Sequence, residues 1–272
     1  MSILSLISKA CDIFKIGVVS LIFLGFANSS YAEKNFSPNV IWSSESGIAR
    51  LQSSEFKNDF YQLVNFYQPQ INPIYCSAAS AVTVLNALKY GKISSQKQFE
   101  ITPPSDSSSK VLDYKLYSQE NFFNERTDVV KSRDVINYKA KRVYGNEKIY
   151  DAGLSLAELS RIFEKVYHVE NKIFYVEKND EESRQNFRQV MKKIFSEKQK
   201  FIIANFDGKI LGQPTGGHFS PIVAYDEKSD SVLVLDVALH KNLWYWVATE
   251  KLYQAMNTKD VEYFHGYIIV GK

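Results

Sequence analysis

The sequence predicts an α+β protein, because helical patterns dominate its first half and strand patterns dominate its second half. Apolar residues recur at helical spacing in three segments before residue 200. Short β-branched or aromatic runs divided by turn residues follow at Phe201–Phe206, Phe219–Tyr225, Ser231–Leu239, Trp244–Ala248 and Tyr267–Gly271. Helices followed by an antiparallel sheet indicate α+β rather than alternating α/β architecture.

Each helix is predicted from an apolar stripe and its end signals. The first covers Ser77–Leu88, and the third covers Glu181–Lys198. The second follows Ser155, which forms a capping box with Glu158. Between the first two helices, Pro103–Arg142 is polar and aromatic by turns, and we predict a loop with short helices there.

Composition and charge exclude several classes of function. Lys and Arg total 33 against 30 Asp and Glu, and a net charge of +3 gives no electrostatic support for nucleic-acid binding. Two cysteines cannot build a disulfide scaffold or a thiolate zinc cluster, and no HExxH, CxxC or His-x3-His spacing occurs. We therefore predict no metal site and no bound cofactor. The absence of repeats and linkers fits one large domain or two closely packed lobes.

The first 32 residues have the pattern of a secretory signal peptide. The apolar run 16–27 is too short for the ~20 residues of a membrane-spanning helix, and small residues precede a cleavage position after Ala32. An uncleaved anchor is the alternative. Cleavage predicts an exported protein, periplasmic or secreted, without a stable membrane span. It would leave Cys76 as the single cysteine of residues 33–272, in an oxidising compartment.

Cys76 is a candidate nucleophile, because it lies at the start of the first predicted helix. Free N–H groups and the helix dipole favour the reactive thiolate at such a position. The alternative is a cysteine packed as a small apolar residue. Gln70, six residues upstream, could donate to an oxyanion together with the Cys76 backbone N–H.

His218 and Asp236 are the candidate partners of this thiol. His218 follows Gly217 and opens a predicted strand, and Asp236 interrupts an apolar run in the next strand. A hairpin between these strands would bring the two side chains close together, so that the carboxylate orients the imidazole. An Asp satisfied by backbone donors is the alternative. His168, His240 and His265 are more easily explained as surface or packing residues.

The sequence resembles the phytochelatin synthase family over nearly all of 33–272. The matching blocks are FYQPQINPIYCSAASAVTVLNAL, NFFNERTDVV, GLSLAEL, GGHFSPIVAYD, VLVLDVALHK and AMNTKD. The resemblance, which is to the short bacterial type, implies a papain-like cysteine hydrolase fold with a helical N-terminal lobe on a sheet lobe. It also implies that Cys76 is the nucleophile, His218 the base and acid, Asp236 the orienter and Gln70 an oxyanion donor.

The resemblance further implies that glutathione and related γ-glutamyl thiol peptides are the partners. Cys76 would be acylated by γ-glutamylcysteine with release of glycine, and the acyl group would pass to water or to a second glutathione, giving phytochelatin. Heavy-metal thiolates of glutathione, such as that of cadmium, are candidate substrates, and a homodimer is a candidate assembly. The expected substrate-binding residues lie in or near these blocks: Gly153, Gly217, Lys241, Asp260 and His265.

Two departures from the family pattern affect substrate recognition. Leu239 stands where the family has an Arg, and His265 stands where the family has the Arg expected to hold the γ-glutamyl carboxylate. A guanidinium fork is not replaced without loss at a bidentate site. Hydrolysis is therefore expected to be at least as important as transfer. A peptidase or amidase acting on another peptide, and a non-catalytic thiol or metal-thiolate binding module, are the alternatives.

Overall fold

The structure, a computed structural model, describes residues 39–90, 116–214, 216–260 and 263–272. These residues fall in the unit Phe36–Lys272. The predicted signal peptide, the first residues of the predicted catalytic domain 33–272 and the part of Pro103–Arg142 before residue 116 lie outside the described residues. No helix in the described ranges combines the length and the apolar character that crossing a membrane requires.

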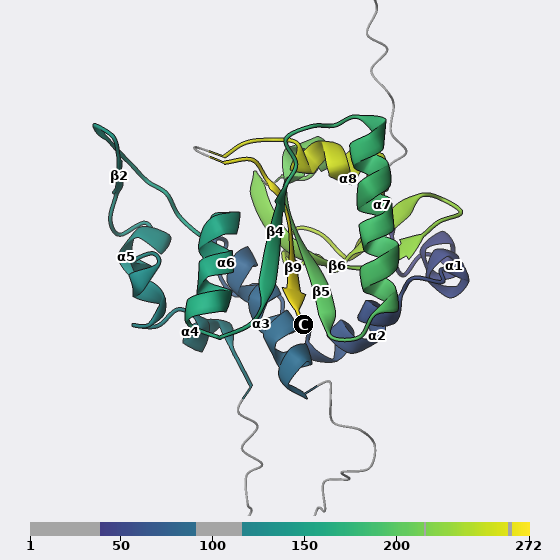
Figure 1. Ribbon diagram of the computed structural model, residues 1–272, viewed down its shortest axis with the longest axis horizontal. Helices are drawn as coiled ribbons and strands as arrows, with labels where there is room; N and C mark the ends of the chain where they lie inside the picture. Colours follow the sequence, from purple (N-terminus) through teal and green to yellow (C-terminus); the bar gives the residue numbers. More distant parts are fainter. Residues whose placement is uncertain (1–38, 91–115, 215, 261–262) are drawn as a thin grey trace, which may run out of the picture. The chain divides into compact units, whose positions relative to one another are not determined.

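An antiparallel sheet forms the centre of the described fold, as Figure 1 shows. Its strands follow the order β1 (Val40–Ile41), β8 (Tyr245–Ala248), β7 (Ser231–Val234), β6 (Gly217–Asp226), β5 (Lys200–Asp207), β9 (Gly266–Gly271) and β4 (Asn171–Tyr175). Every neighbouring pair is antiparallel. The mixture of this sheet with helices confirms the predicted α+β class.

Helices cover both faces of the sheet, so its central strands are buried on both sides. Along β5, Phe201 and Ile203 pack in one apolar cluster, while Ile202 and Phe206 pack in another. This alternation follows from the two-residue period of a strand. The first cluster includes α3 (Cys76–Tyr90) and α6 (Leu156–Lys165), and the second includes α7 (Glu181–Ser196) and α8 (Thr249–Met256). Figure 1 shows α3 and α7 on different sides of β5.

The three predicted helices are present, with ends within a few residues of those predicted. α3 begins at Cys76 itself and continues to Tyr90. The capping box of α6 forms as predicted, because the Ser155 hydroxyl accepts from the Glu158 N–H and the Glu158 carboxylate accepts from the Ser155 N–H at 2.8 Å. α7 is capped by Asp180, whose side chain accepts from the Ser183 N–H.

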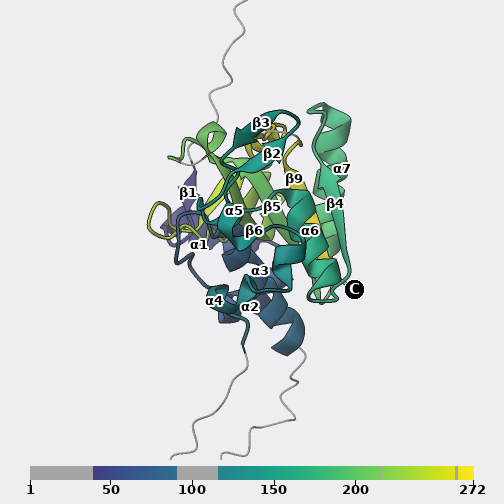
Figure 2. The same cartoon turned by 90° about the vertical axis from the view of Figure 1, so that its left-hand side faces the viewer.

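The described part of the 103–142 segment contains short helices, as predicted. It leads into a β-hairpin that was not predicted from the sequence. Figure 2 shows the hairpin strands β2 and β3 above α5 and α6. The elements of this region are α4 (Gln119–Phe122), η2 (Thr127–Val129), α5 (Arg133–Ile136), β2 (Arg142–Tyr144) and β3 (Glu147–Ile149). The other elements without a sequence prediction are β1, β4, α8, α1 (Glu45–Ser53), α2 (Asn58–Leu63), η1 (Val64–Phe66) and η3 (Gly208–Leu211).

The predicted strand Ser231–Leu239 is shorter than expected, because β7 ends at Val234. The Asp236 carboxylate accepts from the Ala238 N–H at 2.8 Å, and this local bond bends the chain away from the ladder. The Ser220 hydroxyl accepts from the Val237 N–H at 3.3 Å, in place of a strand partner. Asp236 therefore lies in a turn-like segment beyond the strand, and not inside it.

Candidate active site

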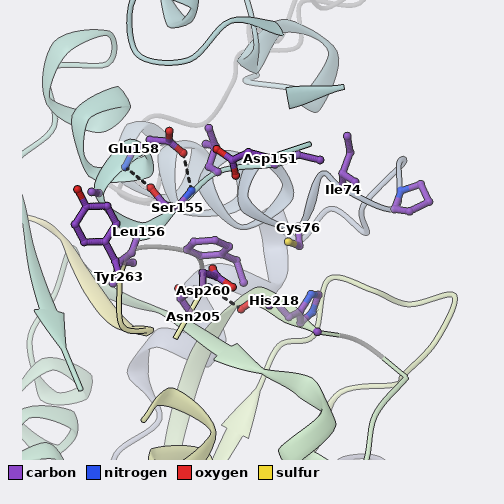
Figure 3. Close-up of a pocket in the computed structure, with 18 of the residues that line it drawn as sticks. Ile74, Cys76, Asp151, Ser155, Leu156, Glu158, Asn205, His218, Asp260 and Tyr263 are labelled. Carbon is purple, nitrogen blue, oxygen red and sulfur yellow. Dashed lines mark hydrogen bonds between the residues drawn. The ribbon is translucent and has the colours of Figure 1, made fainter. Parts of the chain in front are cut away.

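A cavity of about 450 Å³ lies where the start of α3, the start of β6 and the start of α6 meet. This volume falls within the usual range for small-molecule sites. Figure 3 shows Cys76, His218, Asp260 and Tyr263 on its walls, with Ser155 and Glu158 above them. Residues far apart in the sequence thus line one cavity.

Cys76 is the first residue of α3 and lines this cavity half-buried. The turn before it is fixed by Asn72, whose carbonyl accepts from the Tyr75 N–H at 2.9 Å and whose side chain accepts from the Ile74 N–H at 3.1 Å. The helix is buried from Ser77 to Ala87, so its start is anchored while the thiol of Cys76 stays partly accessible. The position has the N-terminal helix field that the sequence predicts.

His218 and Asp236 meet as the hairpin argument predicted. Nε2 of His218 lies 2.9 Å from Oδ1 of Asp236, and both side chains are buried. The hydroxyl of Ser220 lies 3.1 Å from the same ring nitrogen. With Nε2 occupied in this way, Nδ1 is the ring atom left to face the thiol of Cys76.

The pKa of His218 depends on both of its side-chain neighbours, Asp236 and Cys76. Burial lowers the pKa of His218, but its hydrogen bonds with Asp236 and Cys76 outweigh burial and raise that pKa to about 10. An imidazole that keeps its proton beside a thiol stabilises the thiolate form of that thiol. The arrangement therefore has the chemistry of a nucleophilic thiol with an attached acid and base.

The Asp236 carboxylate is held by more than the imidazole. The Ala238 N–H donates to Oδ1, and Asn242 Nδ2 donates to Oδ2 at 3.3 Å. The hydroxyl of Tyr67 donates to the Asp236 carbonyl at 2.7 Å. The predicted alternative, a carboxylate satisfied by backbone donors, thus applies together with the His218 contact, because Oδ1 is bonded both to the Ala238 N–H and to the imidazole. Asn242 was not predicted as part of this group, since the sequence shows only that it follows a predicted strand.

Gln70 lines the same cavity as Cys76. One N–H of its side-chain amide donates to the Asn72 carbonyl at 3.0 Å, and the second N–H of the amide is left over. Its Oε1 is buried without a hydrogen-bond partner. The backbone N–H of Gln70 donates to the Val237 carbonyl at 2.8 Å, which ties this loop to the segment that carries Asp236.

Four of the five predicted substrate-binding residues line the cavity: Gly153, Gly217, Lys241 and Asp260. His265 does not, because it is 2% exposed and lies behind the wall that Asp260 forms. Gly153 has φ +69°, a left-handed conformation that favours glycine at this point of the wall. Leu239 is 47% exposed and is not a lining residue, although its neighbour Ala238 is.

The upper wall of the cavity is a charged cluster that the sequence reasoning missed. Lys131 is buried and pairs with Asp151 at 2.8 Å and with Glu158 at 3.1 Å. Arg142, on the β2–β3 hairpin, pairs with the same two carboxylates, and the Tyr144 hydroxyl donates to Asp151 at 2.6 Å. Burial raises the pKa of Asp151, but the bonds from Lys131 and Tyr144 outweigh it and lower that pKa. The capping-box Glu158 was the one visible signal of this cluster.

The described residues contain no group of three or more His, Cys, Asp and Glu side chains placed to hold a metal ion. His168 and His240 lie away from the cavity lining. A thiol, an imidazole and an amide line the cavity, and the Asp236 carboxylate contacts the imidazole from behind. This set of groups suits acyl transfer through a cysteine nucleophile.

Comparison with known proteins identifies the family. Residues 32–266 match the model of the phytochelatin synthase family, so the chain belongs to that family. It is 27% identical over 216 residues to glutathione gamma-glutamylcysteinyltransferase 3 of Lotus japonicus, covering 78% of this chain and 37% of the relative. It is 25% identical over 203 residues to glutathione gamma-glutamylcysteinyltransferase 1 of Arabidopsis thaliana, covering 74% and 34%.

A shorter match links the chain to a fungal relative. It is 40% identical over 57 residues to the glutathione gamma-glutamylcysteinyltransferase of Schizosaccharomyces pombe, covering 21% of this chain and 14% of the relative. The chain spans about a third of the length of the plant relatives described above. The family predicted from the sequence blocks is thus confirmed.

Proposed function

We propose that this protein is a thiol enzyme that cleaves glutathione into glycine and a γ-glutamylcysteinyl group carried on Cys76. The observation that supports this most strongly is that Cys76, His218 and Gln70 line one cavity, while the buried Asp236 carboxylate contacts the imidazole of His218 from behind. The relatives are named for transfer of the γ-glutamylcysteinyl group of glutathione. The papain-like version of the α+β fold is part of the same proposal.

Each side chain has a defined part in the proposed first step. The Cys76 thiolate attacks the carbonyl carbon of the cysteinyl–glycine bond, and Gln70 Nε2 and the Cys76 N–H donate to the oxyanion. The carbon–nitrogen bond then breaks, and protonated His218 gives its proton to the leaving amine of glycine. The product is a thioester between Cys76 and the γ-glutamylcysteinyl group. Asp236 keeps the imidazole oriented throughout.

The second step returns the enzyme to its starting state. His218 takes a proton from water, or from the α-amine of a second glutathione, as that group attacks the thioester carbonyl. The carbon–sulfur bond breaks and the thiolate of Cys76 is restored. Water gives γ-glutamylcysteine, and glutathione gives phytochelatin. Heavy-metal thiolates of glutathione would enter this step as substrates, and no cofactor bound by the chain takes part.

Hydrolysis is proposed to be at least as important as transfer. A second peptide must be positioned near the thioester, and positioning is a large part of the rate of such a step. Leu239 supplies no cation at the rim of the cavity, so an acceptor carboxylate has fewer partners there. Water requires no such partner. We further propose that the enzyme works after export, following cleavage behind Ala32.

Product analysis tests the proposal. Residues 33–272 are incubated with glutathione, with and without cadmium, and the products are identified by mass spectrometry. Glycine and γ-glutamylcysteine, with less phytochelatin, are expected. Cys76→Ser should abolish the formation of all of these products. His240→Asn is the matched histidine control, because His240 is exposed and lies outside the cavity lining. Absence of glycine release by the intact protein would favour a peptidase of other specificity or a thiol-binding module.

A further inference from the structure

A buried serine beside His218 and Asp236 contacts both sides of this pair. The Ser220 hydroxyl lies 3.1 Å from Nε2 of His218, and it accepts from the Val237 N–H at 3.3 Å. Val237 directly follows Asp236 in the chain, and Ser220, Asp236 and Val237 are all 0% exposed. The hydroxyl therefore joins the strand that carries the imidazole to the segment that carries the carboxylate.

The direction of the bonds at this serine follows from the carboxylate. Nε2 of His218 is 2.9 Å from Oδ1 of Asp236, and a carboxylate only accepts, so Nε2 carries a proton. Ser220 Oγ then accepts from the same Nε2–H while it accepts from Val237, which uses both lone pairs of the hydroxyl oxygen. The oxygen is thus an acceptor for two donors that belong to different segments.

The sheet register shows where the chain leaves the ladder between β6 and β7. The Leu235 N–H bonds to the Pro221 carbonyl at 2.9 Å, but proline has no N–H to donate back, so the pairing is weaker at this point. In a continued antiparallel ladder, the next donor on the same side, the Val237 N–H, would bond to the Phe219 carbonyl. It bonds to Ser220 Oγ instead. The ladder therefore ends where the serine accepts its next donor.

Leaving the ladder moves the carboxylate to the imidazole. The register of Ile222 with Val234, if it continued, would set Asp236 directly opposite Ser220. His218, two residues earlier in β6, would then be only a diagonal neighbour, with Cβ atoms about 7–8 Å apart. With the chain bent at its bond to the serine hydroxyl, Oδ1 of Asp236 instead lies 2.9 Å from Nε2.

We infer that Ser220 is a positioning residue: its hydroxyl holds the Asp236 segment off the ladder, so that the carboxylate orients the imidazole for Cys76. Ser220 is fully buried and does not line the cavity, so it acts through its neighbours and not on the substrate. The Ala238 N–H and Asn242 bind the carboxylate itself, whereas the serine binds the backbone beside it. The inference deepens the proposed function and rests on it for the identity of the reaction.

Removal of the hydroxyl should lower turnover without weakening substrate binding. In Ser220→Ala, we expect kcat for glycine release to fall about 10²-fold, because a small misplacement of a catalytic group has an effect of this size. KM should stay nearly unchanged, since the serine lies outside the cavity lining. Ser80→Ala is the control, because it removes a buried hydroxyl without a hydrogen-bond partner among the described residues, and it should leave both constants unchanged.

Threonine and valine at position 220 provide a matched pair of the same shape. Ser220→Thr keeps the hydroxyl and should keep most of the activity, whereas Ser220→Val should lose activity as Ser220→Ala does. Any strain from the added methyl group is common to both, so their difference reports the hydroxyl alone. The pair also replaces Ser220→Ala if that variant does not fold. Urea unfolding gives the folded fraction, and kcat is expressed per folded molecule.

A double-mutant cycle decides whether the serine acts through the carboxylate. Added to Asp236→Ala, Ser220→Ala should cause no further loss of kcat, because the group that the serine positions is already absent. A purely structural serine would lower the free energy of unfolding and leave kcat per folded molecule unchanged. Wild-type turnover in Ser220→Val, or a loss in the double variant as large as the two single losses multiplied, would overturn the inference.

Alkylation of Cys76 by iodoacetamide provides a readout that needs no glutathione. A less well oriented imidazole stabilises the thiolate less, so Ser220→Ala should be alkylated more slowly at pH 7 than Ser80→Ala. If the intact protein releases no glycine, the proposed function fails, and the alkylation rates still decide the role of Ser220. Equal rates in the two variants would overturn the inference, so the two failures are distinguishable.

Discussion

Nε2 of His218 and Oδ1 of Asp236 are 2.9 Å apart, although Asp236 lies beyond the end of the strand that pairs with β6. The bond from the Ala238 N–H holds the carboxylate where the imidazole reaches it. This leaves Nδ1 of His218 facing Cys76. The contact thus fixes which edge of the ring serves the thiol, and it is the relationship on which the proposed chemistry depends.

Asp236→Asn should lower kcat by about 10³- to 10⁴-fold, because an amide can hold the wrong imidazole tautomer. Glycine release measured at saturating glutathione gives this value. Asp134→Asn, on an exposed part of α5, is the control and should leave kcat unchanged. Near-normal turnover in Asp236→Ala would show that Asp236 only accepts structural hydrogen bonds from the Ala238 N–H and Asn242.

The stability of the protein should depend on His218 at alkaline pH. The pKa of His218 is raised from 6.5 to about 10 in the folded state, so the folded state binds the proton more tightly than the unfolded state. This contribution is complete below pH 6.5 and is lost as the pH rises through about 10. Urea unfolding from pH 6 to pH 10 should show a decline in the free energy of unfolding. The decline should be smaller in His218→Asn, and equal declines would contradict the raised pKa.

Gln70→Ala should lower kcat by about 10²- to 10³-fold with a small change in KM, as expected for loss of one oxyanion donor. Steady-state kinetics of glycine release measures both constants. Gln254→Ala, at an exposed position of α8, provides the matched amide control. A variant that changes KM alone would place Gln70 in substrate binding and not in transition-state stabilisation.

The sequence predicted the catalytic candidates better than the walls around them. Cys76, His218 and Asp236 were found because a helix start, a Gly-preceded strand and a charge in an apolar run are local signals. In the Lys131–Asp151–Glu158–Arg142 cluster, only Glu158 has a local signal, its capping box, and the cluster itself was missed because its members meet through tertiary contacts. β4 was missed because Asn171–Tyr175 is short and half polar, and its pairing with β9 is what makes it a strand.

Leu239→Arg should raise the ratio of phytochelatin to γ-glutamylcysteine. Leu239 is exposed and follows the lining residue Ala238, so a longer cationic side chain there has room to reach an acceptor carboxylate at the rim. The ratio is measured by mass spectrometry at fixed glutathione concentration, with Leu239→Gln as the uncharged control. An unchanged ratio in Leu239→Arg would mean that the acceptor is held elsewhere.

The most direct test of the proposed function is to trap the acyl-enzyme. The protein is mixed briefly with glutathione, quenched in acid, digested and mapped by mass spectrometry. We predict a γ-glutamylcysteinyl group on the peptide that contains Cys76, with release of an equal amount of glycine, and no such group in Cys76→Ala. The same group on another residue, or glycine release without any adduct on Cys76 in a rapid-quench time course, would contradict the assignment of Cys76 as the nucleophile.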